Sequence, residues 1–369
     1  MKSIFSVAKI LIITIFTFIL LDFVFGKYLY KKFIRKNFKD VDTSFAIKDK
    51  VYDHKFVSNF KGLAGWGNIR FEFCTDSNGF RSSCEDQFRN TKNFDIGFIG
   101  DSFTEAVGVD YKDSFVGVIE KNLKNQKIAN LAVASYGTSI YFSKINYLLD
   151  QGYNFKEIFV FIDLSDIVDD TLCYKLDNGS VKRRSTFKKC FEGDLEFQDS
   201  LNEFLKKRLR LTYETKNLLR NKLVEKKIIS LKPSLLQTEH ERSKWTYKYE
   251  SAKYNNYSLE EATNIQFENM NKLSSLLKSK NIDLTIAVYP WPGTLKNDVE
   301  NNKQTILWRE FCKNNCKNFY NFMKPFFEIS KNKEFYEVYK MFYIENDHHF
   351  NELGNKIIAD NFLKLYNQK

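Results

Sequence analysis

The stretch FDIGFIGDSFTEAVGV, residues 94–109, contains the pattern that decides the fold. Residues 96–99 form a short apolar run that is typical of a buried strand, and a helical pattern follows Phe103. Gly100 permits a tight turn between the two, which leaves Ser102 at the start of the helix. A serine there can be a nucleophile, because helix amides and the helix dipole favour developing negative charge, or it can simply be an N-cap. This stretch alone does not decide between the two roles.

The same strand-and-helix pattern repeats along the chain. Apolar runs at residues 128–133, 158–162 and 284–289 predict further buried strands, with helical patterns after Ser139 and at residues 265–277. Alternation of this kind predicts an α/β domain whose parallel sheet is covered by helices on both faces. Ligands of such sheets bind at the carboxyl ends of the strands, so the residues that follow each run are the candidates for chemistry.

The composition indicates a globular protein with a basic surface. Hydrophobic residues make up 43% of the chain and aromatic residues 16%, which is ample for a buried core and excludes a disordered protein. The net charge of +11 suits an acidic partner such as a nucleic acid, an anionic lipid or an acidic glycan. The chain has no zinc-finger spacing, aromatic RNA-binding signature or basic heptad region, so we do not expect it to bind nucleic acid.

The N-terminus predicts a transmembrane anchor. No charge interrupts residues 10–21, and residues 4–25 can cross a bilayer if Lys9 snorkels and Asp22 lies near the interface. A Phe-Val-Phe tripeptide stands where a small-residue cleavage site would be expected. We therefore expect an uncleaved anchor over residues 1–26.

Two features predict opposite sides of the membrane for the body of the protein. One is the charge distribution around the anchor, and the other is the arrangement of the cysteines. Two lysines precede the apolar run and six basic residues follow it by position 39, which by the positive-inside rule keeps the body in the cytoplasm. The six cysteines instead fall into three sequence-local couples, as disulfides of an oxidising compartment would, with six buried free thiols as the alternative. We expect a single-pass inner-membrane protein with its body on the periplasmic side, and no zinc, because the couples lack metal-site spacing. The couples are Cys74 with Cys84, Cys173 with Cys190, and Cys312 with Cys316.

An insertion divides the body of the chain. The strand-and-helix alternation stops between about residues 171 and 262, within a domain that we place at residues 93–369. A basic juxtamembrane segment and lead-in, residues 27–92, precede that domain. Inside the insertion, residues 201–231 are helix-like and strongly basic, which suits a membrane surface, an acidic polymer or, more commonly, a solvated face. We expect this helical insertion to form a lid or a wall of the substrate site.

Near the C-terminus, the stretch NDHHFNELG, residues 346–354, supplies the partners that a nucleophilic serine needs. An imidazole takes the proton of the serine, and a carboxylate holds that imidazole in the right tautomer. We assign His349 as the base and Asp347 as the acid that orients it. The histidines outside this stretch, His54 and His240, are expected at the surface. A metal site is not expected, because no third histidine falls at a suitable spacing.

These motifs carry a family resemblance. Gly-Asp-Ser-Phe-Thr at residues 100–104, continuing into Gly-Val at 108–109, resembles the first sequence block of the SGNH/GDSL hydrolase superfamily, and residues 347–354 resemble its last block. Asn-Gly-Phe-Arg at 78–81 and Tyr-Pro-Trp-Pro at 289–292 are similar to membrane-anchored members that act on surface or wall glycans. The resemblance spans most of the chain outside the insertion. It implies a three-layer, flavodoxin-like fold and ester chemistry without a cofactor.

Two inner blocks depart from the family pattern. Counting from Asn130, Ser135 stands where the family has its oxyanion glycine, and Ser165 stands where it has an asparagine. Both family positions donate hydrogen bonds to the oxyanion. Ser135 can still donate through its backbone N–H and Ser165 through its hydroxyl, although a hydroxyl reaches less far than an amide.

The sequence thus predicts a serine-dependent ester hydrolase or O-acyltransferase that acts on an acylated glycan or a similar surface ester. Ser102 attacks the ester carbonyl, His349 takes and later returns the proton, and Asp347 orients His349. No cofactor is expected. The alternative is a catalytically impaired binding or assembly protein for surface polysaccharide, which the altered positions at Ser135 and Ser165 favour. Drift to a scaffold would not be expected to spare nucleophile, base and acid together.

Overall fold

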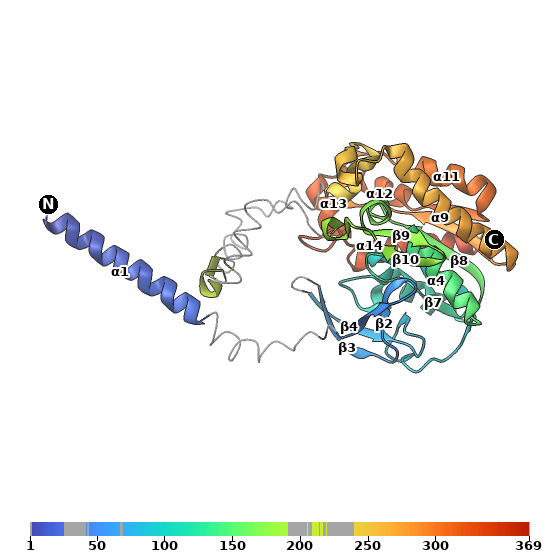
Figure 1. Ribbon diagram of the computed structural model, residues 1–369, viewed down its shortest axis with the longest axis horizontal. Helices are drawn as coiled ribbons and strands as arrows, with labels where there is room; N and C mark the ends of the chain where they lie inside the picture. Colours follow the sequence, from blue (N-terminus) through green and yellow to red (C-terminus); the bar gives the residue numbers. More distant parts are fainter. Residues whose placement is uncertain are drawn as a thin grey trace. The chain divides into compact units, whose positions relative to one another are not determined.

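The chain divides into two compact units (Figure 1). The first unit contains Met1–Asp40 with Glu192–Lys232, and the second contains Val41–Phe191 with Pro233–Lys369. The computed structural model describes residues 2–25, 42, 44–66, 69–190, 205, 209–213, 215–216, 219 and 240–368.

The first unit begins with one long helix, α1 (Lys2–Val24). Near its end, Asp22 accepts a hydrogen bond from the backbone N–H of Thr212 at 2.8 Å. Within the described residues, no helix combines the length and the apolarity that a bilayer crossing requires. The anchor over residues 1–26 stays a prediction. The exposed apolar side chains of α1 include Ile10, Ile13, Ile15, Phe16, Phe18, Ile19, Leu20 and Leu21.

The second unit is built on an eight-stranded sheet with the strand order β12-β11-β8-β6-β7-β5-β4-β3. The pairs from β12 to β7 are parallel, and those from β7 to β3 are antiparallel. The predicted α/β class with a mostly parallel sheet is therefore confirmed, and the antiparallel extension is new. The parallel strands are β6 (Asn93–Ile99), β7 (Ile128–Asn130), β8 (Asn154–Ile162), β11 (Asp283–Val288) and β12 (Asn318–Asn321).

The second predicted strand ends three residues early, at Asn130 rather than at residue 133. The Asn130 side chain accepts a hydrogen bond from the N–H of Ala132 at 3.1 Å and donates one to the carbonyl of Thr104 at 2.9 Å. An asparagine that bonds the backbone two residues ahead turns the chain. The apolar residues that follow are buried in this turn and not in the sheet.

The lead-in adds three antiparallel strands to the sheet. They join it where Arg81 pairs with Asn130 of β7. A separate hairpin, β1 (Ala46–Asp49) with β2 (Asp53–Phe56), precedes them. The added strands are β3 (Lys61–Trp66), β4 (Ile69–Thr75) and β5 (Arg81–Ser82).

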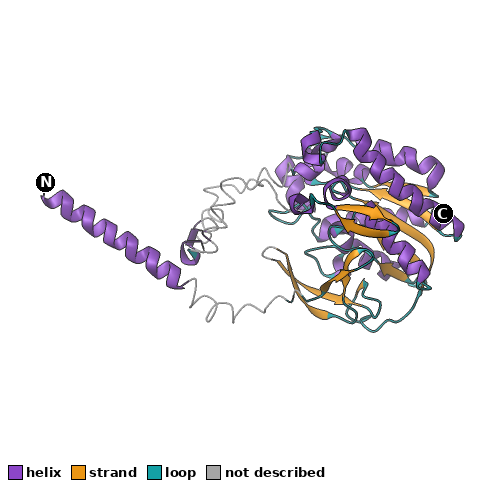
Figure 2. Ribbon diagram, in the orientation of Figure 1, coloured by secondary structure: helices purple, strands orange, loops and turns teal. Residues whose placement is uncertain are grey.

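Helices lie on both sides of the strands (Figure 2). Rings of Phe98 and Phe159 contact Phe362 of α14 at centroid distances of 5.3 and 4.9 Å, which places α14 on one face of the sheet. The helices predicted after Ser139 and at residues 265–277 are present as α4 and α9. The main helices are α3 (Phe115–Asn122), α4 (Thr138–Asp150), α9 (Leu259–Ser279), α10 (Pro292–Asn297), α11 (Lys303–Asn315), α12 (Met323–Ser330), α13 (Phe335–Phe342) and α14 (Glu352–Tyr366).

The helix predicted after Phe103 is much shorter than expected. It is α2 (Ser102–Glu105), and Ala106 leaves it in a left-handed conformation with φ of 63°. The fully buried guanidinium of Arg81 donates to the carbonyls of Glu105 and Ala106. These carbonyls would accept N–H groups from the next turn if the helix continued, so Arg81 takes the place of that turn.

All three predicted cysteine couples form disulfides. Their Cα–Cα distances are 5.1 Å for Cys74–Cys84, 5.6 Å for Cys173–Cys190 and 4.6 Å for Cys312–Cys316, within the range that the bond requires. The alternative of six buried free thiols is therefore wrong.

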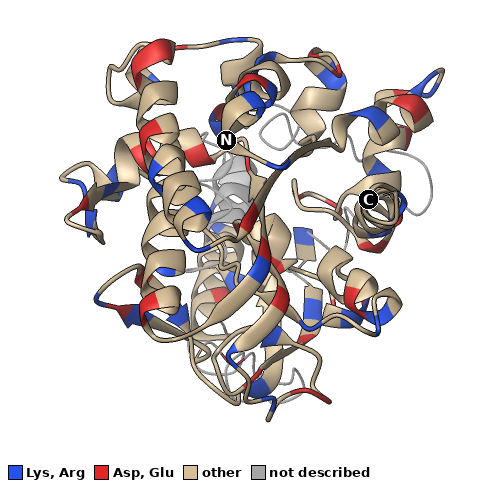
Figure 3. Ribbon diagram, turned by 90° about the vertical axis from the view of Figure 1, so that its right-hand side faces the viewer, with Lys and Arg blue, Asp and Glu red and all other residues tan. Residues whose placement is uncertain are grey.

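The described part of the insertion combines short helical segments with one hairpin, and in the basic stretch residues 205, 210–213, 215–216 and 219 are α-helical. After a short π-helical turn, η4 (Asp169–Cys173), come the hairpin β9 (Tyr174–Asp177) with β10 (Ser180–Arg183) and three 3-10 helices. Most of the basic stretch predicted as a helix at residues 201–231 lies outside the described residues. In the described part of the chain, basic and acidic positions are interspersed over helices and loops (Figure 3). The 3-10 helices are η5 (Phe187–Cys190), η6 (Glu241–Thr246) and η7 (Ser251–Tyr254).

Candidate active site

Ser102 stands between the end of β6 and the first residue of α2, as the sequence predicts. The N-cap of α2 is Asp101, whose carboxylate accepts the N–H of Phe103 at 3.0 Å. Because Asp101 caps the helix, the Ser102 hydroxyl is free for other partners. It lies 2.8 Å from Nε2 of His349, a residue 247 positions away in the sequence.

The base and its acid share a tight loop before α14. The Nδ1 atom of His349 lies 2.5 Å from Oδ1 of Asp347, and the His349 backbone N–H donates to the same oxygen at 2.9 Å. A bridge between Tyr343 and Phe350 closes the loop. The three predicted catalytic residues therefore form one continuous chain of hydrogen bonds from carboxylate to hydroxyl.

A tryptophan from the lead-in completes this chain, and sequence reasoning missed it. The indole N–H of Trp66, in β3, donates to the second carboxylate oxygen of Asp347 at 2.7 Å. Its ring also meets the His349 ring edge-on at a centroid distance of 5.2 Å. Trp66 thus positions both the acid and the base. Trp66 lies between two glycines in the sequence, and that was the one local signal that marked it.

The two charges of the acid–base pair favour each other. Burial disfavours the protonated form of His349, but the Asp347 carboxylate outweighs burial and raises the pKa of His349 above its ordinary value of 6.5. Burial likewise disfavours the ionised form of Asp347, and His349 outweighs it, so the pKa of Asp347 is lowered. Asp347 therefore stabilises the imidazolium that forms when His349 takes the serine proton.

Asp101 is a second close partner of the Ser102 hydroxyl. The Ser102 hydroxyl also lies 3.0 Å from Oδ2 of Asp101, and its single hydrogen can serve either Asp101 or His349. Burial and the neighbouring Asp163 raise the pKa of Asp101 to about 8. The Ser102 hydroxyl therefore has two neighbours, Asp101 and His349, for its one hydrogen.

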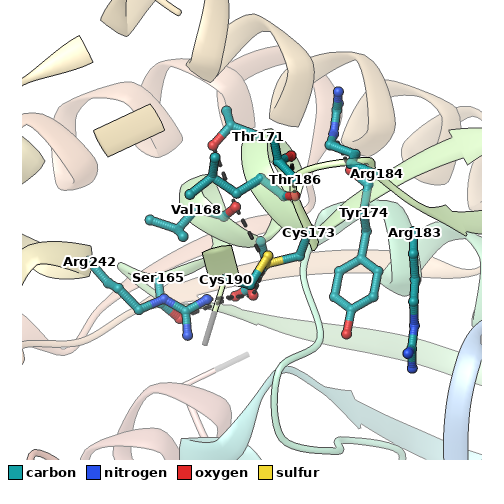
Figure 4. Close-up of a disulfide and its surroundings, with 12 residues drawn as sticks. Ser165, Val168, Thr171, Cys173, Tyr174, Arg183, Arg184, Thr186, Cys190 and Arg242 are labelled. Carbon is teal, nitrogen blue, oxygen red and sulfur yellow. Dashed lines mark hydrogen bonds and ion pairs between the residues drawn. A yellow bond between two sulfur atoms is a disulfide. The ribbon is translucent and has the colours of Figure 1, made fainter. Parts of the chain in front are cut away.

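The structure brings all three candidate serines to one pocket of about 60 Å³. Sites for drug-sized ligands usually measure about 300–1,000 Å³, so this pocket suits a small group. Figure 4 shows Ser165 and Arg242 close to the Cys173–Cys190 disulfide. The lining residues are Asp101, Ser102, Ser135, Ser165, His240, Arg242, Trp291 and His348.

His54 and His240, which were expected at the surface, are half-buried. The His240 ring packs edge-on against Trp291 at 5.6 Å in the pocket wall, and burial lowers its pKa to about 4. The His54 ring bridges the carboxylate of Asp53 and the carbonyl of Ala134, at 2.9 and 2.8 Å. His240 lines the pocket, and His54 contacts the carbonyl of the residue before Ser135. The positions of isolated residues in a sequence do not reveal such contacts.

Ser102 and Ser135, which both line the pocket, have backbone N–H groups that could donate to a bound oxyanion. Among the described residues, neither the N–H of Ser102 nor that of Ser135 makes a hydrogen bond. Ser135 has a φ of 66°, the left-handed region that favours glycine. The adjoining N–H of Ala134 is held by the buried carboxylate of Glu105 at 2.6 Å, which fixes the turn. Two unpaired amides beside a nucleophile are the arrangement that an oxyanion needs.

The Ser165 donors have other partners nearby. Its N–H donates to Asp163 at 2.7 Å, and its hydroxyl lies 3.5 Å from Asp169, at the long limit of a hydrogen bond. Asp163 is itself held by the Tyr289 hydroxyl at 2.8 Å and the Trp291 indole at 2.6 Å. The Ser165 hydroxyl therefore remains only weakly engaged.

Asp347, His348 and His349 are also close enough to be considered as metal ligands, since one ligand atom from each lies within 4.8 Å of the others. Both ring nitrogens of His349 already contact a partner, Asp347 on one side and Ser102 on the other. A metal would have to displace one of these contacts. The donor set therefore fits a proton relay better than a metal centre.

Comparison with known proteins assigns no family to this arrangement. No protein-family model matches the chain, and no curated protein is similar to it.

Proposed function

We propose that the chain is a membrane-anchored serine hydrolase or O-acyltransferase of the SGNH type that acts on a short-chain ester of a surface glycan. The observation that carries the proposal is the hydrogen-bond chain from Asp347 through His349 to Ser102, with contacts of 2.5 and 2.8 Å. The sequence blocks around Ser102 and His349 supply the family resemblance, and with it a three-layer, flavodoxin-like fold.

The mechanism follows from these contacts. Ser102 Oγ bonds to the ester carbonyl carbon while its proton moves to Nε2 of His349, and the carbonyl electron pair moves onto oxygen. The N–H groups of Ser102 and Ser135 stabilise this oxyanion. Collapse expels the alcohol, which takes the proton from His349 and leaves an acyl-serine. Water or a sugar hydroxyl then accepts the acyl group by the reverse sequence.

The pocket supports a short acyl group. Its volume of about 60 Å³ suits an acetyl group, and its polar walls suit a carbonyl and not a long alkyl chain. The decisive experiment is hydrolysis of 4-nitrophenyl acetate by the purified protein, combined with labelling of Ser102 by a fluorophosphonate. The absence of both reactions would favour the second candidate, a binding or assembly protein for surface polysaccharide, which the serines at positions 135 and 165 suggest.

We further propose that α1 anchors the protein in the inner membrane, with the active site in the periplasm. Its exposed apolar side chains and the three disulfides support this placement. A reporter that is active only in the periplasm, fused after Lys369, is expected to be active. A reporter that is active only in the cytoplasm, together with six titratable thiols in freshly lysed cells, would reverse the assignment.

Activity is expected to rise with pH, because His349 acts as a base only when it is neutral. Since Asp347 raises the pKa of His349, the midpoint of the acid limb of kcat/KM is expected above the ordinary value of 6.5. Asp347→Asn removes the charge and is expected to move the midpoint to lower pH while it reduces the maximum. Measured kcat/KM profiles check this, and an unchanged midpoint in the variant contradicts the role of Asp347.

The oxyanion serines are expected to differ in their sensitivity. Ser165→Ala is expected to lower kcat for 4-nitrophenyl acetate about 10-fold with KM nearly unchanged, because an oxyanion bond strengthens in the transition state. Ser135→Gly is expected to be near neutral, since Ser135 donates through its backbone and glycine tolerates its φ of 66°. If Ser165→Ala leaves kcat unchanged and Ser135→Gly lowers it, the assigned donors are wrong, and Ser135 acts through its side chain instead.

A further inference from the structure

The pocket beside Ser102 contains a positive charge that the triad does not use. Arg242, from η6, lines this pocket with Ser102. From the same 3-10 helix, Trp245 donates its indole N–H to the carbonyl of Leu164 at 2.9 Å. This bond attaches η6 to the turn that contains Ser165, so Arg242 comes from a fixed support and not from a free loop end.

One end of the Arg242 guanidinium is held, and the other end is available. Its Nη2 donates to Oδ1 of Asp169 at 2.5 Å. Within the described residues, Nη1 makes no hydrogen bond, and 21% of the side-chain surface is exposed, as a pocket-facing group requires. Burial disfavours the charge, but the Asp169 carboxylate outweighs burial and raises the pKa of Arg242. Arg242 therefore stays cationic.

The turn that contains Asp169 is held in place by a disulfide. Asp169 begins η4, whose last residue is Cys173, and the Cys173 sulfur lies 3.3 Å from the Asp169 carboxylate. The disulfide to Cys190 joins this turn to the end of η5. The cross-link thereby fixes the partner that orients Arg242.

Arg242 shares the pocket with Ser165, whose own donors have other partners. The Ser165 N–H is committed to Asp163, and the Ser165 hydroxyl shares Asp169 with Arg242. Two other polar side chains of the wall are imidazoles, and burial lowers the pKa of both His240 and His348, which leaves them neutral. Among the described lining residues, Arg242 carries the fixed positive charge.

We propose that Arg242 is a catalytic residue that donates a charge-assisted hydrogen bond from Nη1 to the oxyanion, beside the N–H groups of Ser102 and Ser135. This role rests on the proposed ester chemistry. As Ser102 Oγ bonds to the carbonyl carbon, the carbonyl electron pair moves onto oxygen and the serine proton moves to His349; Arg242 keeps its own protons throughout. A hydrogen bond from a charged donor is roughly twice as strong as one between neutral groups. Arg242 therefore takes over the role of the asparagine side-chain amide that the resembled family has at the position of Ser165.

The test uses 4-nitrophenyl acetate, which is uncharged, so that any effect of Arg242 on turnover does not come from binding an acidic substrate. Arg242→Met is expected to lower kcat about 10²- to 10³-fold with KM nearly unchanged. Arg242→Lys keeps a charge for Asp169 but loses the planar fork, and it is expected to keep the melting temperature while kcat falls about 10-fold. Lys244→Met, which removes a charge from the same 3-10 helix outside the pocket, is expected to be neutral.

Free guanidinium at low concentration is expected to restore part of kcat in Arg242→Ala, which a purely structural role would not produce. Wild-type kcat in Arg242→Met overturns the proposal, and so does a rise in KM alone, which would indicate ground-state binding. If Arg242→Met does not fold, wild-type kcat in Arg242→Lys overturns it. A wild-type protein that neither hydrolyses the ester nor reacts with a fluorophosphonate contradicts the proposed function, whereas an active protein that is insensitive to Arg242 contradicts this inference alone.

Discussion

Replacing Ser102 or His349 with alanine is expected to abolish ester hydrolysis, with kcat falling by about 10³-fold or more in each variant. Ser102→Ala removes the atom that bonds to the acyl group. His349→Ala removes the imidazole that takes the serine proton. Its Nε2 lies 2.8 Å from Oγ of Ser102. Because the two residues act as one unit, the double variant is expected to lose little more than either single variant. Hydrolysis of 4-nitrophenyl acetate and fluorophosphonate labelling measure these losses.

His348→Ala is the matched control, because His348 is the adjacent imidazole in the same pocket. Its ring stacks on Trp291 at a centroid distance of 4.1 Å and makes no hydrogen bond to Ser102. The variant is expected to keep much more activity than His349→Ala. The reverse order would move the base by one residue, and full activity in Ser102→Ala would reject the assigned nucleophile.

Arg81→Met is expected to lower the free energy of unfolding by about 3–5 kcal/mol, because it leaves three buried backbone carbonyls without their donor and each such loss costs about 1–3 kcal/mol. Arg81 is fully buried and donates to the carbonyls of Glu105, Ala106 and Val109, the last two at 2.6 Å. Methionine fills part of the space but leaves these carbonyls without donors. It also removes the positive charge of Arg81, which opposes the rise that burial causes in the pKa of the Glu105 carboxylate.

Chemical denaturation of the purified protein measures this loss. Arg183→Met is the control. Arg183 forms an ion pair with Asp53, but its side chain is 40% exposed, and exposed ion pairs contribute about 0–1 kcal/mol to stability. A second readout comes from activity near the midpoint of unfolding. Glu105 holds the turn before Ser135, so Arg81→Met is expected to lose activity before it loses secondary structure. Equal destabilisation by the two variants would contradict the structural role of Arg81.

Local patterns in the sequence determined most of the parallel sheet and pointed to the three residues of the hydrogen-bond chain, Ser102, Asp347 and His349. The apolar runs at residues 96–99, 158–162 and 284–289 became strands, because strands buried on both faces need near-continuous apolar residues. The blocks around Ser102 and His349 could be recognised because each is a short run of neighbouring residues that forms a single turn. Cysteine couples close in sequence formed disulfides because short loops bring their ends together at low entropic cost.

Only the tertiary structure decided which side chains surround these motifs. Trp66 contacts Asp347 across 281 positions, and Arg242 reaches Asp169 across 73. Neither residue has a periodicity or a turn signal that points to the pocket. The short α2 likewise depends on Arg81, 24 positions upstream of the Glu105 carbonyl that it contacts. A sequence encodes local dihedral preferences and apolar periodicity, whereas contacts of this kind exist only after the sheet has joined distant segments, and their hydrogen bonds are satisfied in no other arrangement.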